Sequence, residues 1–221
     1  MSPPVSNILI VASHMDDEVI SCGGTIAKHV VDGDFVTVCV IANRAYGHQY
    51  NGEEIKEEID DCLSAQKVLG YQKFLYLGQK DECLDHSLIT VITDLEKAVA
   101  DTKPTVVYLP WSGDFNQDHR AVFGAIMVVC RPYAPHRVNT LIAYESMSTS
   151  PVHAPFIPSL YVDIGLYIEK KIQALKCYRR EAREWPHPRS PEGIMVLAKR
   201  RGSEIGLEEA ESFMVIREIS R

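Results

Sequence analysis

Two clusters of side chains in this sequence have the residue types needed to bind a metal ion and to move protons. The first is Ser13-His-Met-Asp-Asp-Glu18, in which a histidine and two aspartates lie within four residues, and the second is Asp114-Phe-Asn-Gln-Asp-His-Arg120. Neighbouring carboxylates repel each other when both are ionised, and a divalent cation would offset that repulsion. Histidine nitrogens and carboxylate oxygens are good zinc ligands, and a catalytic zinc takes three of them plus water. The clusters therefore indicate a catalytic metal site.

Each cluster taken alone also has an ordinary structural explanation. Acidic residues favour the first turn of a helix, so Asp16–Glu18 could serve only as a helix cap. His119 could be a loop residue beside an N-capping Asp118. The capping explanation does not account for His14, however, and it does not account for the two clusters occurring together.

The elements that would position these clusters follow from the alternation of apolar and amphipathic segments. Short runs rich in β-branched residues predict five strands, at Asn7–Ala12, Phe35–Ile41, Lys73–Leu77, Thr105–Leu109 and Thr140–Tyr144. The segments between them predict four helices, at Asp17–Val31, Glu53–Leu69, Ser87–Ala100 with Ser87 as N-cap, and Asp118–Cys130. This alternation predicts an α/β fold, a Rossmann-like three-layer sandwich with a mainly parallel sheet.

The remainder of the chain is expected to complete the same domain. We predict, in order, a loop at Ser146–Pro158, a short strand near Tyr161–Asp163, a helix over Tyr167–Tyr178, a proline-rich turn at Trp185–Pro191, a last helix, and a final strand near Phe213–Arg217. No break in composition divides the sequence, so residues 1–221 are predicted to form a single domain.

Topology gives a reason why the two clusters would meet. In an open sheet of strand order 3-2-1-4-5, the first and fourth strands are neighbours, and a ligand crevice opens at their carboxyl ends. His14 and Asp17 follow the first predicted strand, and His119 follows the fourth. A dinucleotide site is excluded, because the first turn lacks G-x-G-x-x-G and Gly23-Gly24 comes too late, inside the helix.

Composition excludes some partners. The chain has 23 basic and 30 acidic residues and a net charge of −7, which argues against binding to nucleic acid. The apolar runs are of strand length, so we expect no membrane span, and the N-terminus lacks the features of a signal peptide. Six scattered cysteines form no C-x-x-C pair and are expected to be reduced thiols. These features predict a cytoplasmic protein.

Three segments together resemble the PIG-L/LmbE-like deacetylases. His14-Met-Asp-Asp-Glu18 followed by Gly23-Gly24 is similar to the family signature H-P-D-D-E…G-G, and Asn116-Gln-Asp-His-Arg-Ala-Val122 is similar to H-x-D-H-R-A-V. The C-terminal part, from Arg189-Ser-Pro-Glu-Gly through Arg201-Gly-Ser-Glu-Ile-Gly206 to Ala210-Glu-Ser-Phe213, is similar to the closing pattern R-G…G…A-E-x-F. The ordered set spans almost the whole chain.

The resemblance implies a zinc-dependent hydrolase that removes the N-acetyl group of a small amino-sugar compound. It implies that His14, Asp17 and His119 hold the metal and that Asp16 is the general base for the attacking water. Asp118 is expected to orient a neighbouring ligand. A homo-oligomer would also fit the family.

Two positions depart from the family pattern. Met15 replaces the usual proline, which changes the rigidity of the turn rather than its chemistry. Asn116 replaces a histidine that in the family helps to stabilise developing negative charge; asparagine donates a neutral hydrogen bond but carries no positive charge. Two alternatives therefore stay open: an amidase acting on another N-acyl conjugate, and a catalytically weak member that binds a metal or ligand.

Further polar residues are candidates for substrate binding because they follow predicted strands or lie in the proline-rich turn. These candidates are Arg44, Tyr46, His48, Asp81, His187 and Arg189.

Overall fold

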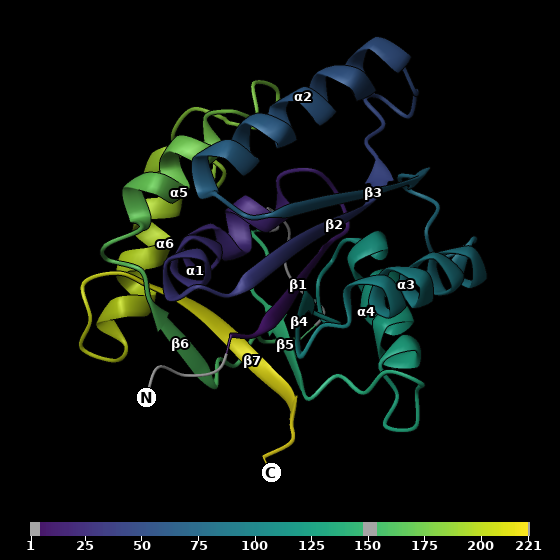
Figure 1. Cartoon of the computed structure of the whole chain (residues 1–221). Helices are drawn as coiled ribbons and strands as arrows, with labels where there is room; N and C mark the ends of the chain where they lie inside the picture. Colours follow the sequence, from purple (N-terminus) through teal and green to yellow (C-terminus); the bar gives the residue numbers. More distant parts are fainter. Residues whose placement is uncertain (1–4, 148–153, 221) are drawn as a thin grey trace.

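The computed structural model describes residues 5–147 and 154–220, which form one seven-stranded sheet with helices on both faces (Figure 1). The strand order is β3-β2-β1-β4-β5-β7-β6. The strands are β1 (Asn7–Ala12), β2 (Phe35–Asn43), β3 (Lys73–Lys80), β4 (Val106–Pro110), β5 (Thr140–Tyr144), β6 (Leu160–Asp163) and β7 (Ala210–Glu218). The first five pair in parallel, and β7 runs antiparallel to both β5 and β6. The predicted order 3-2-1-4-5 is confirmed.

The helices divide between the two faces of the sheet. One face carries α1 (Asp17–Asp32), α2 (Gly52–Leu69), α5 (Ile168–Leu175) and α6 (Pro191–Ser203), and the other carries α3 (Leu88–Thr102) and α4 (Gln117–Val129) (Figure 1). The three-layer α/β sandwich is therefore confirmed. Within the described residues, none of the helices combines the length and the apolar character needed to span a bilayer.

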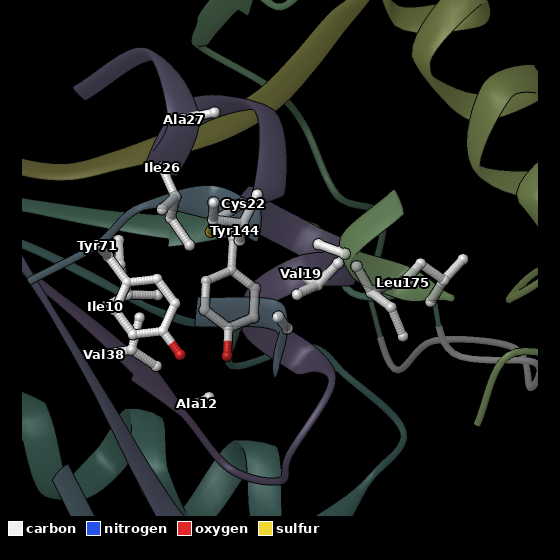
Figure 2. Packing of buried hydrophobic residues seen from close by; sticks show 14 of the residues in the cluster. Ile10, Ala12, Val19, Cys22, Ile26, Ala27, Val38, Tyr71, Tyr144 and Leu175 are labelled. Atoms are coloured by element: carbon white, nitrogen blue, oxygen red, sulfur yellow. The ribbon is translucent and has the colours of Figure 1, made fainter. Parts of the chain in front are cut away.

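Successive side chains of β1 point alternately into the two hydrophobic cores, one on each face of the sheet. Ile8 and Ile10 point into the cluster under α1, whereas Leu9 and Val11 point into the cluster under α3 and α4. All four are buried, as expected for a central parallel strand covered on both faces. The hydroxyl of Tyr144 donates to the carbonyl of Val11 at 3.0 Å, which satisfies the only polar atom of a large core side chain. Figure 2 shows the core on the α1 side of the sheet, with the labelled residues Ile10, Ala12, Val19, Cys22, Val38 and Tyr144.

The glycine pair of the first motif serves helix packing. A Cβ on Gly24 would lie 2.6 Å from Ile164, and one on Gly23 would lie 2.9 Å from the Lys171 side chain. These glycines therefore let α1 approach the segment that leads into α5. This close approach packs the middle of α1 against the domain, and the first cluster lies at the N-terminal end of the same helix.

Some sequence predictions need correction in detail. Strand β2 continues to Asn43, two residues beyond its predicted end at Ile41, because the parallel pairing with β3 continues to Lys80. Ser87 occupies the N-cap position of α3 but its side chain makes no cap bond. The N-cap of α4 is Asn116 rather than Asp118. Part of the predicted loop at Ser146–Pro158, residues 148–153, lies outside the described residues.

Candidate functional site

Three side chains of types that can bind a metal ion converge at the carboxyl ends of β1 and β4. Asp17 Oδ2 lies 3.5 Å from His14 Nδ1 and 3.3 Å from His119 Nε2. The ligand atoms of His14, Asp17 and His119 all lie within 4.8 Å of one another, and all three residues are buried. The two imidazole rings are 5.3 Å apart between centroids. This arrangement offers two nitrogens and one oxygen to a single cation, leaving room for a further ligand.

The opposite nitrogen of each imidazole faces a buried carboxylate. His119 Nδ1 lies 2.9 Å from Asp114 Oδ2. His14 Nε2 lies 2.9 Å from Asp81 Oδ1 and 3.4 Å from Asp118 Oδ2. Carboxylates in this position orient ligating histidines and direct the other nitrogen to the metal. We call these six residues the metal cradle: His14, Asp17, His119, Asp81, Asp114 and Asp118.

A second combination of ligand-type groups, His14 with Asp81 and Asp118, fits a metal less well. Asp118 already accepts backbone N–H groups from Glu82 at 2.6 Å and Leu84 at 3.1 Å. Asp81 accepts the same Glu82 N–H at 2.8 Å. These oxygens are committed to the β3–α3 loop, so their geometry supports orientation of His14 rather than a separate metal site.

Electrostatics favours a cation at the cradle. Burial alone would lower the pKa of His119, but Asp17 and Asp114 outweigh it and raise the pKa to about 9. Burial would likewise raise the pKa of Asp17, yet the two histidines hold it well below its usual value. The site thus attracts positive charge, and its donor set of two imidazoles and a carboxylate fits a divalent ion such as zinc.

Asp16 lies beside the cradle in a strained conformation. Its φ of 106° is in the left-handed region, which costs a non-glycine residue about 1–3 kcal/mol. It occupies the N-cap position of α1, but its side chain makes no cap bond. Instead Oδ1 accepts from Arg44 at 2.8 Å and Oδ2 accepts from Arg189 at 3.1 Å. Burial raises the pKa of Asp16 to about 6, against the opposing effect of both guanidinium groups.

Two further buried carboxylates, which the sequence analysis did not single out, complete these contacts. Glu181 pairs with Arg189 and lies 3.5 Å from Arg44, and Glu58 lies 3.6 Å from the Arg44 Nε. The Tyr46 hydroxyl lies 2.5 Å from Glu58 Oε1 and 3.1 Å from Glu181 Oε1, so its one proton lies between two carboxylate acceptors. Both glutamates lie inside helical or irregular segments with no motif around them. We call the following set the arginine clamp: Arg44, Arg189, Glu58, Glu181 and Tyr46.

The cradle and the clamp border two adjoining cavities. A small one of about 60 Å³ is lined by Asp16, the three cradle ligands, Ile20, Arg44, Asn116, Ser146, Met147 and Arg189. A larger one of about 360 Å³ shares four of these residues (His14, Arg44, Asn116 and Arg189) and adds Ala45, Tyr46, Asp81, Glu82, Gln117, Glu181 and Arg183. The lining of the larger cavity is almost entirely polar, which suits a hydrophilic ligand of small-molecule size.

The remaining sequence candidates have different surroundings. Asn116 lines both cavities, and its side-chain oxygen accepts the backbone N–H of Asp118 at 2.8 Å. His48 is exposed and pairs with Glu82 at 2.8 Å. His187 accepts the backbone N–H of Arg189 at 3.1 Å. Neither histidine lines the two cavities, so their contact with a substrate stays a prediction.

Comparison with known proteins agrees with this geometry. The family model for PIG-L, GlcNAc-PI de-N-acetylase, matches residues 9–130, more than half of the chain. The uncharacterized deacetylase YaiS of Escherichia coli K12 is 26% identical over 178 residues, which are 78% of this chain and 90% of YaiS.

Solved structures share the fold over nearly the whole chain. The conserved protein TT1542 from Thermus thermophilus is 24% identical with a TM-score of 0.80, over 98% of this chain and 97% of that one. The N,N′-diacetylchitobiose deacetylase from Pyrococcus horikoshii is 21% identical with a TM-score of 0.79, over 95% of this chain and 83% of that one. With the family model, the YaiS match and the buried His/Asp site taken together, the chain belongs to the PIG-L family and is a metal-dependent deacetylase.

Proposed function

We propose that this protein hydrolyses the N-acetyl group of a small amino-sugar compound of the N-acetylglucosamine type, with zinc as its metal. The observation that carries the proposal is the convergence of His14, Asp17 and His119 on one point, with the carboxylate of Asp16 facing the same cavity. That arrangement provides the ligands and the base that amide hydrolysis needs.

In this proposal the residues of the chain have separate tasks. His14, Asp17 and His119 would hold zinc, which supplies Lewis acidity that activates water and polarises the acyl carbonyl. Asp16 accepts a proton from the attacking water and returns it to the leaving amine. Burial of this carboxylate raises its pKa above the ordinary value, and a more basic carboxylate is a better proton acceptor.

The carboxylates behind the histidines support this chemistry indirectly. Asp118 and Asp81 orient His14, and Asp114 orients His119. The side-chain oxygen of Asn116 is used to cap α4, so its amide N–H group is the part that can donate to the acyl oxygen. This assigns to a neutral donor the role that a histidine has in the family pattern.

The amine side of the substrate would occupy the larger cavity. This cavity is lined by Arg44, Tyr46, Asp81 and Arg189, whose polar groups would bind sugar hydroxyls. His48 and His187 do not line it, and their contact with the substrate stays a prediction. The similarity to a diacetylchitobiose deacetylase supports an amino-sugar substrate.

The free cysteines among the described residues support a reducing, cytoplasmic location. Assembly as a homo-oligomer stays a prediction.

The test is acetate release by the zinc-loaded protein from a panel of N-acetylhexosamines and their nucleotide and glycoside conjugates. We expect zinc-dependent release from one class of compound and its loss in Asp16→Asn. Full activity of Asp16→Asn would show that the assignment of the base is wrong. No release from any compound at full zinc occupancy would contradict the amino-sugar substrate and direct the search to other N-acyl conjugates.

A further inference from the structure

Both oxygens of Asp16 are engaged by side chains from distant parts of the chain. Arg44 comes from the loop after β2, and Arg189 comes from the segment between α5 and α6. The carboxylate is 1% exposed, so solvent does little to hold it in place. The orientation of the proposed base therefore depends on how firmly the two guanidinium groups are themselves fixed.

Glu181 contacts both of these guanidinium groups. Its Oε2 atom pairs with Arg189 Nη1 and lies 3.5 Å from Arg44 Nη1, and its Oε1 lies 3.1 Å from the Tyr46 hydroxyl oxygen. Its side chain is 4% exposed, so these ion pairs are little screened by solvent. Glu58 reaches only Arg44 and Tyr46, which leaves Glu181 as the described carboxylate, besides Asp16, that bridges the two arginines.

Charge balance explains why a bridging carboxylate is needed. Arg44 and Arg189 would repel each other. Their two positive charges would also lower the basicity of the Asp16 carboxylate, which the reaction requires. A carboxylate shared by both offsets the repulsion and competes with Asp16 for their charge. It also fixes the direction from which each guanidinium approaches, because the planar fork of arginine favours defined geometries.

We infer that Glu181, which lies outside the family motifs identified in this chain, is a positioning residue of the hydrolytic reaction: by bridging Arg44 and Arg189 it aims the carboxylate of Asp16. The inference rests on the proposed role of Asp16 as the base. The contacts of Glu181 are with Arg44, Arg189 and Tyr46 rather than with the cradle ligands, so it acts on the reaction through Asp16.

A matched control is the ion pair of Arg179, which lies two residues before Glu181 in the sequence. Its partner is the buried carboxylate of Asp61 in α2, and Arg179 Nε lies 2.8 Å from Asp61 Oδ1. This pair anchors the same segment without contacting Arg44 or Arg189, the two partners of Asp16. Asp61→Asn therefore removes one ion pair between α2 and this segment, as a purely structural perturbation. Glu181→Gln keeps the size of the side chain and removes its charge, and Glu181→Asp keeps the charge.

The experiment measures kcat, KM and zinc affinity for Glu181→Gln, Glu181→Asp and Asp61→Asn, in the wild-type and the Asp16→Asn backgrounds. We expect Glu181→Gln to lower kcat by about 10- to 100-fold with zinc affinity unchanged. Glu181→Asp should recover part of the loss, and Asp61→Asn should retain wild-type kcat. In the Asp16→Asn background, Glu181→Gln should have no further effect, because residues that act as a unit are not additive.

Two results would overturn the inference: wild-type kcat in Glu181→Gln, or the same loss of kcat in both backgrounds. If the wild-type protein releases no acetate, the proposed function fails, and crystal structures decide the inference separately. We expect Arg44 and Arg189 to shift away from the Asp16 carboxylate in Glu181→Gln and to stay in Asp61→Asn. Unchanged contacts in Glu181→Gln would then overturn it.

Discussion

The metal cradle and the arginine clamp border the same cavity but are built in different ways. The cradle ligands follow two adjacent parallel strands, backbone N–H groups of the β3–α3 loop fix Asp81 and Asp118, and the backbone N–H of Asn116 fixes Asp114. The clamp is assembled from three separate segments (the loop after β2, α2, and the chain between α5 and α6) and is held by side-chain ion pairs. The cradle is thus organised by the main chain, whereas the clamp depends on the tertiary packing of α2 and the C-terminal third.

This difference separates two functions within one site. We expect the cradle to determine whether a cation binds, and the clamp to set the charge state and the direction of the Asp16 carboxylate. Changes in the two regions are therefore expected to give distinguishable results when zinc affinity and turnover are measured on the same variants.

The largest effect is expected from His119→Ala. Loss of one of three protein ligands should abolish zinc binding at micromolar metal and lower acetate release by about 1,000-fold or more. Zinc content of the purified protein and its thermal shift on adding zinc are the measurements. His136→Ala, which removes a histidine bonded to the Pro104 carbonyl, is the control. Wild-type zinc content in His119→Ala would show that the cation binds elsewhere.

Asp16→Asn should have the next largest effect and should separate the two regions. Loss of the base is expected to lower kcat by about 100- to 10,000-fold, whereas zinc affinity should not change because the cradle ligands remain. Isothermal titration with zinc and steady-state kinetics give both quantities. A parallel loss of zinc would make Asp16 a metal ligand, and the distinction between cradle and clamp would then be wrong.

Asp114→Asn should reverse that pattern. Asp114 orients His119 through its Nδ1 atom, so its loss is expected to weaken zinc binding by about 10- to 100-fold. Competition with a chelator of known affinity measures the change. Glu181→Gln is the paired variant on the clamp side, and an equal loss of zinc affinity in both would remove the contrast between the regions.

The smallest effect is expected at Asn116, where stability and chemistry can be separated. Asn116→Ala removes the cap of α4 and should lower the free energy of unfolding by about 1 kcal/mol. Asn116→Ser retains a capping oxygen and should keep most of that stability, yet it lacks the amide group. If the amide donates to the substrate, both variants lose turnover; wild-type kcat in Asn116→Ser would limit Asn116 to capping.

Much of the molecule follows from local sequence. Runs of β-branched residues determined β1, β2, β4 and β5, and the alternation with helices determined a parallel three-layer fold. The two motifs after β1 and β4 indicated His14, Asp17 and His119 as the metal ligands, because adjacent parallel strands bring their carboxyl ends together. The strand order is confirmed, and the three side chains do converge, because each inference depends on short-range pattern and a single assumption about topology; their binding of a metal stays a prediction.

Only the tertiary structure decided the surroundings of Asp16. Glu58 and Glu181 lie in segments rich in charged residues, whose sequence is typical of exposed helices and loops. Their burial depends on how α2 packs against α5 and the chain that follows it. Asn116, rather than Asp118, caps α4, because the Asp118 side chain turns back to the β3–α3 loop. Ion pairs between residues more than a hundred positions apart leave no periodic signal, so they become visible only when the folded chain brings the charges together.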